Sequence, residues 1–169
     1  MNAVLDRWNN AEESEALDAM TACCGAKRWA EAMVALRPMA SVVELSLASD
    51  RVWSTMGVAD WMEAFACHPK IGERKAAHAS ARSQAWSRQE QSSTEDAKEG
   101  VLAELAAGNA LYEERFGFTY ILCATGKSAE EMLGILSRRL ASERRAELRE
   151  AAEQQRQITQ IRLGKWLVE

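Results

Sequence analysis

The stretch from Asn109 to Leu140, "NALYEERFGFTYILCATGKSAEEMLGILSRRL", decides the fold class. Its first part completes a helical pattern over 94–116, and its last part begins with the capping box "SAEE", which predicts a helix over 128–141. Between them lies the apolar run "FTYILCA", 118–124, which fits either a strand or a buried extended segment, because its length suits both. The stretch therefore predicts two helices joined by a short apolar segment.

Apolar residues recur at helical spacing on both sides of this stretch. Thr94 is the predicted N-cap of the helix over 94–116, with Glu95 and Asp96 in its first turn. The other predicted helices span 13–24, 27–36, 41–54, 58–67 and roughly 143–163, with a short helix around Trp86. A chain of 169 residues without repeats or a linker has the size of one domain. We therefore predict an all-α, single-domain helical bundle over residues 1–169.

The composition excludes several classes of function. The net charge of −4 argues against a protein that binds nucleic acid or an anionic membrane through its overall field. No apolar run is long enough to cross a bilayer. The four cysteines have no spacing typical of a disulfide framework, and two of them, Cys23 and Cys24, are neighbours. This pattern favours reduced thiols in a cytoplasmic protein.

One of the two histidines stands in "FACHPKIGE", 65–73, directly before a proline. Pro69 forbids a continuing helix and restricts the backbone of His68. Two interpretations remain open for His68. It is either a histidine at the end of a helix, stabilised there by the helix dipole, or a positioned acid–base group, since its unperturbed pKa lies near physiological pH.

Polar residues that suit a ligand follow in "WSRQEQSS", 86–93. If this part is helical, Ser87, Glu90 and Gln91 share one face, which presents a hydroxyl, a carboxylate and an amide. The alternative is an ordinary solvated helix face. Arg162, near the C-terminus, stands among apolar residues and needs a partner, either a carboxylate or ureido group of a ligand or an internal salt bridge.

Motifs for a metal or a phosphate-containing cofactor are absent from the sequence. The second histidine, His78, stands ten residues beyond His68, and no HExxH pattern occurs. The glycines form neither a P-loop nor a dinucleotide-binding motif. The basic runs Ser137–Arg145 and Gln154–Leu163 are interpreted as solvated helix faces with ion pairs, because acidic residues interleave the first of them.

Five motifs, in order along essentially the whole chain, resemble the 2-oxo-4-hydroxy-4-carboxy-5-ureidoimidazoline (OHCU) decarboxylase family. They are "CCGAKRWAEAMVALRP", "HPKIGE", "WSRQEQSS", "NALYEERFGFTYILCATGKSAEEMLGILSRRL" and "QITQIRL". The resemblance implies a helical bundle without cofactor or metal, commonly a homodimer. It also implies a carboxy-lyase that converts OHCU to (S)-allantoin, the last step of urate degradation.

The resemblance assigns a catalytic role to His68, with Glu90 as its carboxylate partner. The residues that it implies for substrate binding are Pro69, Ser87, Glu90, Gln91, Tyr120, Ile121, Leu122, Cys123, Ala124 and Arg162. For the segment from Tyr120 to Ala124, it implies that backbone N–H and C=O groups face a planar ureide. Two alternatives stay open, a helical interaction module without chemistry and a metal-dependent ureide hydrolase.

Overall fold

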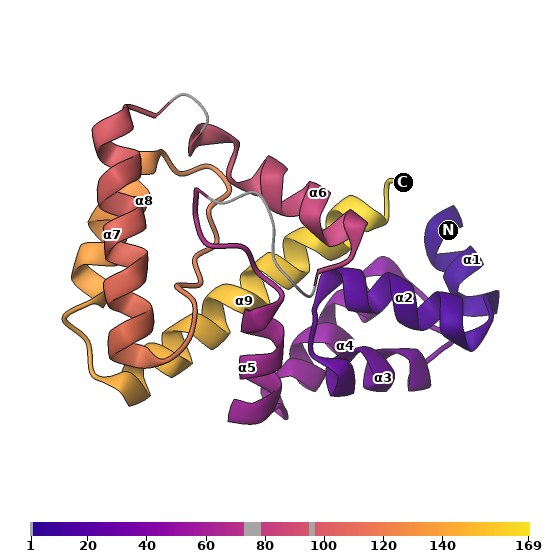
Figure 1. The fold of residues 1–169 in the computed structure, drawn as a ribbon. Helices are drawn as coiled ribbons and strands as arrows, with labels where there is room; N and C mark the ends of the chain where they lie inside the picture. The colour runs from indigo at the N-terminus through magenta and orange to yellow at the C-terminus, as the bar shows by residue number, and fades with distance from the viewer. Residues whose placement is uncertain (1, 73–78, 95–96) are drawn as a thin grey trace. The chain divides into compact units, whose positions relative to one another are not determined.

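The computed structural model describes residues 2–72, 79–94 and 97–169, and every regular element within these ranges is helical (Figure 1). The predicted all-α fold class is therefore confirmed. His78, Glu95 and Asp96 lie outside the described residues. The chain forms two compact units, one of residues 1–64 and 156–169 and the other of residues 65–155.

The first unit packs its helices in the order of the chain, α1 against α2, α2 against α3, and α3 against α4. Its elements are α1 (Ala3–Asn10), α2 (Glu13–Cys23), α3 (Lys27–Ala35), α4 (Val42–Ser54), most of α5 (Val58–Ala66) and the end of α9 (Arg144–Trp166). Helix α1 was not predicted from the sequence. It begins because the Asn2 side chain accepts hydrogen bonds from the backbone N–H groups of Val4 and Leu5, both at 3.0 Å.

The second unit contains the predicted pair of helices around the apolar run. Its elements are the end of α5, α6 (Ala81–Glu90), a 3-10 turn (Ser92–Thr94), α7 (Glu99–Phe116), α8 (Ala129–Arg139) and the first half of α9. Helices α7 and α8 lie side by side (Figure 1). Gly108 permits this close approach, because a Cβ atom at that position would lie 2.5 Å from Cδ2 of Leu136.

The capping box at the start of α8 is present as predicted. The Ser128 hydroxyl accepts from the N–H of Glu131, and the Glu131 carboxylate accepts from the N–H of Ser128. The predicted start of the preceding helix is wrong, because α7 begins at Glu99 with Lys98 as its N-cap. Thr94 instead ends the 3-10 turn, where its hydroxyl donates to the carbonyl of Gln91 at 2.8 Å.

The apolar run 118–124 forms neither helix nor strand. Apart from the half-buried Thr119, all of its residues are buried. Of the two interpretations left open by its length, the buried segment is correct. A buried segment without regular structure must find partners for its backbone groups elsewhere, and these partners organise the candidate site described below.

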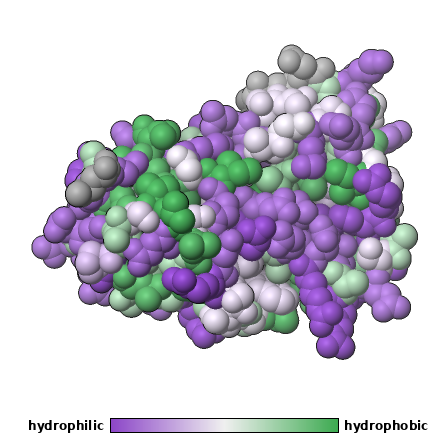
Figure 2. All heavy atoms as spheres, turned by 180° about the vertical axis from the view of Figure 1, so that it is seen from behind, coloured by the Kyte–Doolittle hydropathy of each residue, from purple (hydrophilic) through white to green (hydrophobic). Residues whose placement is uncertain are grey.

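The exposed surface of the described residues is mixed. Figure 2 shows one face, on which apolar atoms gather in patches between hydrophilic ones. The large apolar side chains that are exposed are Leu36, Val42, Val43, Leu47, Val58, Leu111 and Val168. In the described ranges, no helix combines the length and the apolar character that crossing a membrane requires.

Candidate functional site

His68 lies in the turn directly after α5, as the proline that follows it predicts. Helix α5 ends at Ala66, and the N–H of His68 donates to the carbonyl of Phe65 at 3.1 Å. The imidazole Nε2 atom lies 2.7 Å from Oε1 of Gln155. Because an amide oxygen only accepts, a hydrogen bond at this contact requires a proton on Nε2.

Gln155 was not predicted from the sequence, although it orients the histidine. It is fully buried on α9. A signal was available, since Gln155 precedes Arg162 by seven residues, which is two turns of the same helix. The basic run that contains both residues was interpreted as a solvated face, with Arg162 set apart from it, and burial contradicts this interpretation for Gln155.

The predicted polar group from "WSRQEQSS" lies at the C-terminal end of α6, which is the short helix expected around Trp86. Ser87 is buried, and Glu90, the last residue of the helix, is half-buried. Gln91 caps the helix, and its Oε1 atom accepts from the N–H of Gly72 at 2.9 Å. The structure thus joins the end of α6 to the segment that continues from His68 through the buried Pro69.

Several backbone groups of the segment 119–124 already have protein partners. The Ile121 carbonyl accepts from Nη1 of Arg139 at 2.5 Å. The Cys123 N–H donates to Oε1 of Gln154 at 2.9 Å, and the Cys123 carbonyl accepts from Nζ of Lys127 at 2.8 Å. These groups hold the segment in place. The sequence predicted that the backbone groups of the whole segment face a ligand. Only the backbone groups that have no partner within the chain are available for this role.

Leu122 is the residue between these two tethered positions. It is buried, and in the described part of the chain neither its N–H nor its C=O makes an intrachain hydrogen bond. Buried backbone groups nearly always have a partner. An N–H and a C=O on one residue form the donor and acceptor pair that an amide or a ureide matches.

A buried ion pair anchors this segment. Arg139 donates from Nε to the Glu147 carboxylate at 2.5 Å, and the hydroxyl of Tyr112 donates to the same carboxylate. Arg139 is 7% exposed and Glu147 1% exposed, so the interpretation of residues 137–145 as a solvated face is wrong at Arg139. Position in the sequence could not reveal this, because the partner of Arg139 lies on the next helix.

Burial and the charges of this cluster shift the pKa values of its members. Burial, and then the hydrogen bond to Glu147, raise the pKa of Tyr112 well above its usual value. Burial also raises the pKa of Tyr120. Burial, the largest single effect, lowers the pKa of Arg139, but the hydrogen bond to Glu147 and the electrostatic effects of Tyr112, Glu147 and Tyr120 together outweigh it, so the pKa is raised. Both tyrosines are therefore neutral and Arg139 is charged throughout the physiological range.

Arg162 is buried, as its apolar neighbours in the sequence predict, and it belongs to the first unit. The other predicted site residues belong to the second unit, so the place of Arg162 beside them stays a prediction. Within residues 2–72, 79–94 and 97–169, no group of three or more His, Cys, Asp or Glu side chains is arranged to hold a metal ion.

Comparisons with known proteins agree on one family. A family model described as OHCU decarboxylase matches residues 9–164. The uric acid degradation bifunctional protein TTL of Arabidopsis thaliana is 35% identical over 149 residues, covering 88% of this chain and 46% of that protein. The chain thus spans about half the length of the Arabidopsis protein. The OHCU decarboxylase of Amia calva is 30% identical over 127 residues, covering 75% of this chain and 73% of that protein.

Solved structures agree with these relatives. A crystal structure of OHCU decarboxylase in the presence of (S)-allantoin matches with a TM-score of 0.77 at 32% identity, covering 90% of this chain and 99% of that one. A crystal structure of (S)-allantoin synthase matches with a TM-score of 0.71 at 16% identity, covering 96% of this chain and 53% of that one, and it supports the fold alone. The predicted fold class and carboxy-lyase class are confirmed. The chain belongs to the OHCU decarboxylase family.

Proposed function

We propose that this chain, acting as one domain over residues 1–169, decarboxylates OHCU to (S)-allantoin in the last step of urate degradation, without a cofactor. The observation that carries the proposal is the 2.7 Å contact between His68 Nε2 and Gln155 Oε1. It supports an oriented imidazole ring at His68, as a stereospecific proton transfer requires. The name of the family supplies the substrate class.

The substrate can accept the electrons that decarboxylation releases. When the bond between the hydroxyl-bearing ring carbon and the carboxylate breaks, its electron pair forms a double bond to the neighbouring carbon of the C=N group, the C=N π pair moves to the nitrogen, and carbon dioxide leaves. The carbon of the former C=N bond then takes up a proton on one face, while the neighbouring hydroxyl becomes the carbonyl and its proton passes to the ring nitrogen. The protein has to supply orientation, exclusion of water and that proton.

His68 delivers the proton to one face of the decarboxylated intermediate. Glu90 accepts a hydrogen bond from the substrate hydroxyl or from a ring N–H, and Ser87 and Gln91 orient the substrate. The Gln91 side chain acts through its amide nitrogen, since its oxygen already accepts from Gly72. Pro69 holds His68 in its turn, because a proline restricts the backbone of the residue before it.

The segment from Tyr120 to Ala124 forms the backbone wall that receives the ureide. Within this segment, the N–H and the C=O of Leu122 are the donor and the acceptor for the ureide. This assignment is supported by the absence of an intrachain partner for either group in the described part of the chain. Arg162 binds the carboxylate or the ureido group, by resemblance to the family.

Circular dichroism of freshly generated OHCU tests the proposal. The substrate decays spontaneously to racemic product, so the enzyme should give the signal of (S)-allantoin alone, faster than the background. Racemic product at the background rate would refute the activity. Glu90→Gln keeps the shape and removes the charge, and turnover equal to wild type would show that Glu90 is structural.

We also propose that the protein is a cytoplasmic homodimer that binds neither nucleic acid nor membranes. The cysteine pattern supports a reducing compartment, and the net charge of −4 argues against polyanionic partners. Exposed apolar side chains, such as Val43 and Leu47 one turn apart on α4, support self-association. Sedimentation at several concentrations tests the dimer.

A further inference from the structure

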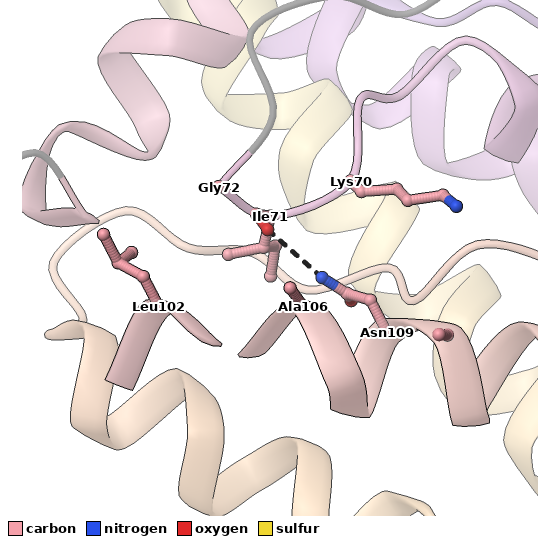
Figure 3. A pocket seen from close by; sticks show the side chains of 7 residues that line it. Lys70, Ile71, Gly72, Leu102, Ala106 and Asn109 are labelled. Atoms are coloured by element: carbon pink, nitrogen blue, oxygen red, sulfur yellow. Dashed lines mark hydrogen bonds between the residues drawn. The ribbon is translucent and has the colours of Figure 1, made fainter. Parts of the chain in front are cut away.

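Polar contacts within the described part of the chain tie down the segment that follows His68 and Pro69. The N–H of Gly72 donates to Gln91 at the end of α6. The Ile71 carbonyl accepts from Nδ2 of Asn109 on α7 at 3.1 Å (Figure 3). Nζ of Lys70 lies 2.7 Å from Oε2 of Glu113, one turn further along α7. Each of the three residues after Pro69 is therefore held by a side chain from a neighbouring helix.

Apolar packing under this segment is incomplete. A pocket of about 340 Å³ lies between residues 70–72 and the residues Leu102, Ala106, Asn109 and Ala110 of α7. Figure 3 shows Asn109 bonded to Ile71 among the residues that line this space, while the Lys70 side chain points away from Leu102 and Ala106. Ile71 lines this pocket although it is only 5% exposed, so the polar contacts act together with its apolar packing to fix the position of the segment.

Asn109 differs from the other two tethers. It is 3% exposed, whereas the side chains of Lys70 and Glu113 are 37% and 32% exposed, so solvent screens their ion pair. The second polar atom of the Asn109 amide, Oδ1, is buried and has no hydrogen-bond partner in the described part of the chain. An unpaired buried acceptor is unfavourable, so stability alone would favour an apolar residue of similar size here. The contribution that such a residue could not replace is the hydrogen bond from Nδ2 to Ile71.

We infer that Asn109 is a positioning residue for the decarboxylation. Through the Ile71 carbonyl it fixes the segment that begins at His68, and it thereby sets the face of the intermediate to which the proton is delivered. The inference rests on the proposed function. It does not place Asn109 in contact with the substrate.

The variant Asn109→Leu tests the inference, since it keeps the size of the side chain and removes the donor. A displacement of catalytic groups by about 1 Å can cost roughly 100-fold in rate, so we expect kcat to fall about 10- to 100-fold. Substrate binding does not depend on the proton donor, so KM should change by less than about threefold. The fraction of (S)-allantoin in the enzymatic product should also fall, because the direction of proton delivery is less defined.

Asn9→Leu is the matched control, because Asn9 ties another loop of the chain in the same way. Its Nδ2 donates to the Met39 carbonyl, and its Oδ1 accepts from the Met39 N–H, both at 2.9 Å. We expect this variant to have a lower melting temperature and wild-type kcat and stereoselectivity per folded molecule. If Asn109 acted on stability alone, Asn109→Leu would change only the melting temperature, with wild-type kcat and stereoselectivity per folded molecule, and this outcome overturns the inference.

Two further outcomes are informative. If Asn109→Leu does not fold, Asn109→Ser replaces it in the test, because serine is smaller and cannot reach Ile71. We expect the same fall in kcat and in the fraction of (S)-allantoin for this variant. Failure of both variants to fold would make Asn109 a structural residue and overturn the inference. Failure of the proposed function is distinguishable from either outcome, because the wild-type protein itself would then produce racemic allantoin at the background rate.

Discussion

Residues 70–72 and residues 119–124 both border the proposed site in the second unit, but they are held by different chemistry. The first segment is tied by hydrogen bonds with the side-chain amides of Asn109 and Gln91 and by a partly exposed ion pair between Lys70 and Glu113, beside a pocket. The second is buried and tethered by Arg139, whose charge is paired with Glu147. Residues 70–72, which continue from His68, are thus held more weakly than residues 119–124, which form the backbone wall.

Glu113 links the two segments. One oxygen of its carboxylate pairs with Lys70, and the other accepts from the hydroxyl of Thr119 at 3.2 Å. Because Glu113 contacts both segments, the position of residues 70–72 is set relative to residues 119–124. A rigid backbone wall suits the recognition of a planar group, while a histidine that transfers a proton needs only one well-defined approach.

The largest expected effect comes from the group that transfers the proton. A positioned general acid or base contributes about 100- to 10,000-fold, so His68→Ala should lose about that much in kcat. Circular dichroism of freshly generated OHCU measures both the rate and the fraction of (S)-allantoin. Near-normal turnover with intact stereoselectivity would show that His68 is not catalytic. It would also contradict the contrast between a catalytic histidine segment and a binding wall.

The next largest effect is on stability and comes from the wall. Arg139→Met leaves the Glu147 carboxylate buried without its charged partner, which costs about 3–5 kcal/mol of unfolding free energy. Urea denaturation measures this loss. The double variant Arg139→Met/Glu147→Leu removes both charges and should regain much of it. A cost of under about 1 kcal/mol for the single variant would show that the wall is no more firmly held than the histidine segment.

The smallest expected effect comes from the exposed tether of the histidine segment. Lys70→Met removes an ion pair whose partners are both about one third exposed, so the unfolding free energy should change by about 1 kcal/mol or less. The same urea experiment in low and high salt checks it, and added salt should reduce the difference from wild type. A loss as large as that of Arg139→Met would contradict the contrast between the two segments.

Local signals in the sequence predicted the features that depend on neighbouring residues. The "SAEE" capping box, the stop at Pro69 and the short helix around Trp86 were correct, since each depends on contacts within one turn or two. Thr94 was the wrong N-cap because threonine suits several local roles, and here its hydroxyl closes a 3-10 turn. The first helix was missed because its acidic and polar composition obscured the cap at Asn2 and the buried Leu5 and Trp8.

The sequence by itself determined the all-α class, the family and the identity of the histidine proposed for catalysis, because these depend on periodicity and on the order of motifs. Only the tertiary structure revealed that Gln155 orients His68, that Arg139 is buried with Glu147, and that Asn109 ties Ile71 to α7. The physical reason is that each of these contacts joins residues distant in the chain or on different elements. No local pattern specifies which buried polar group will find which partner.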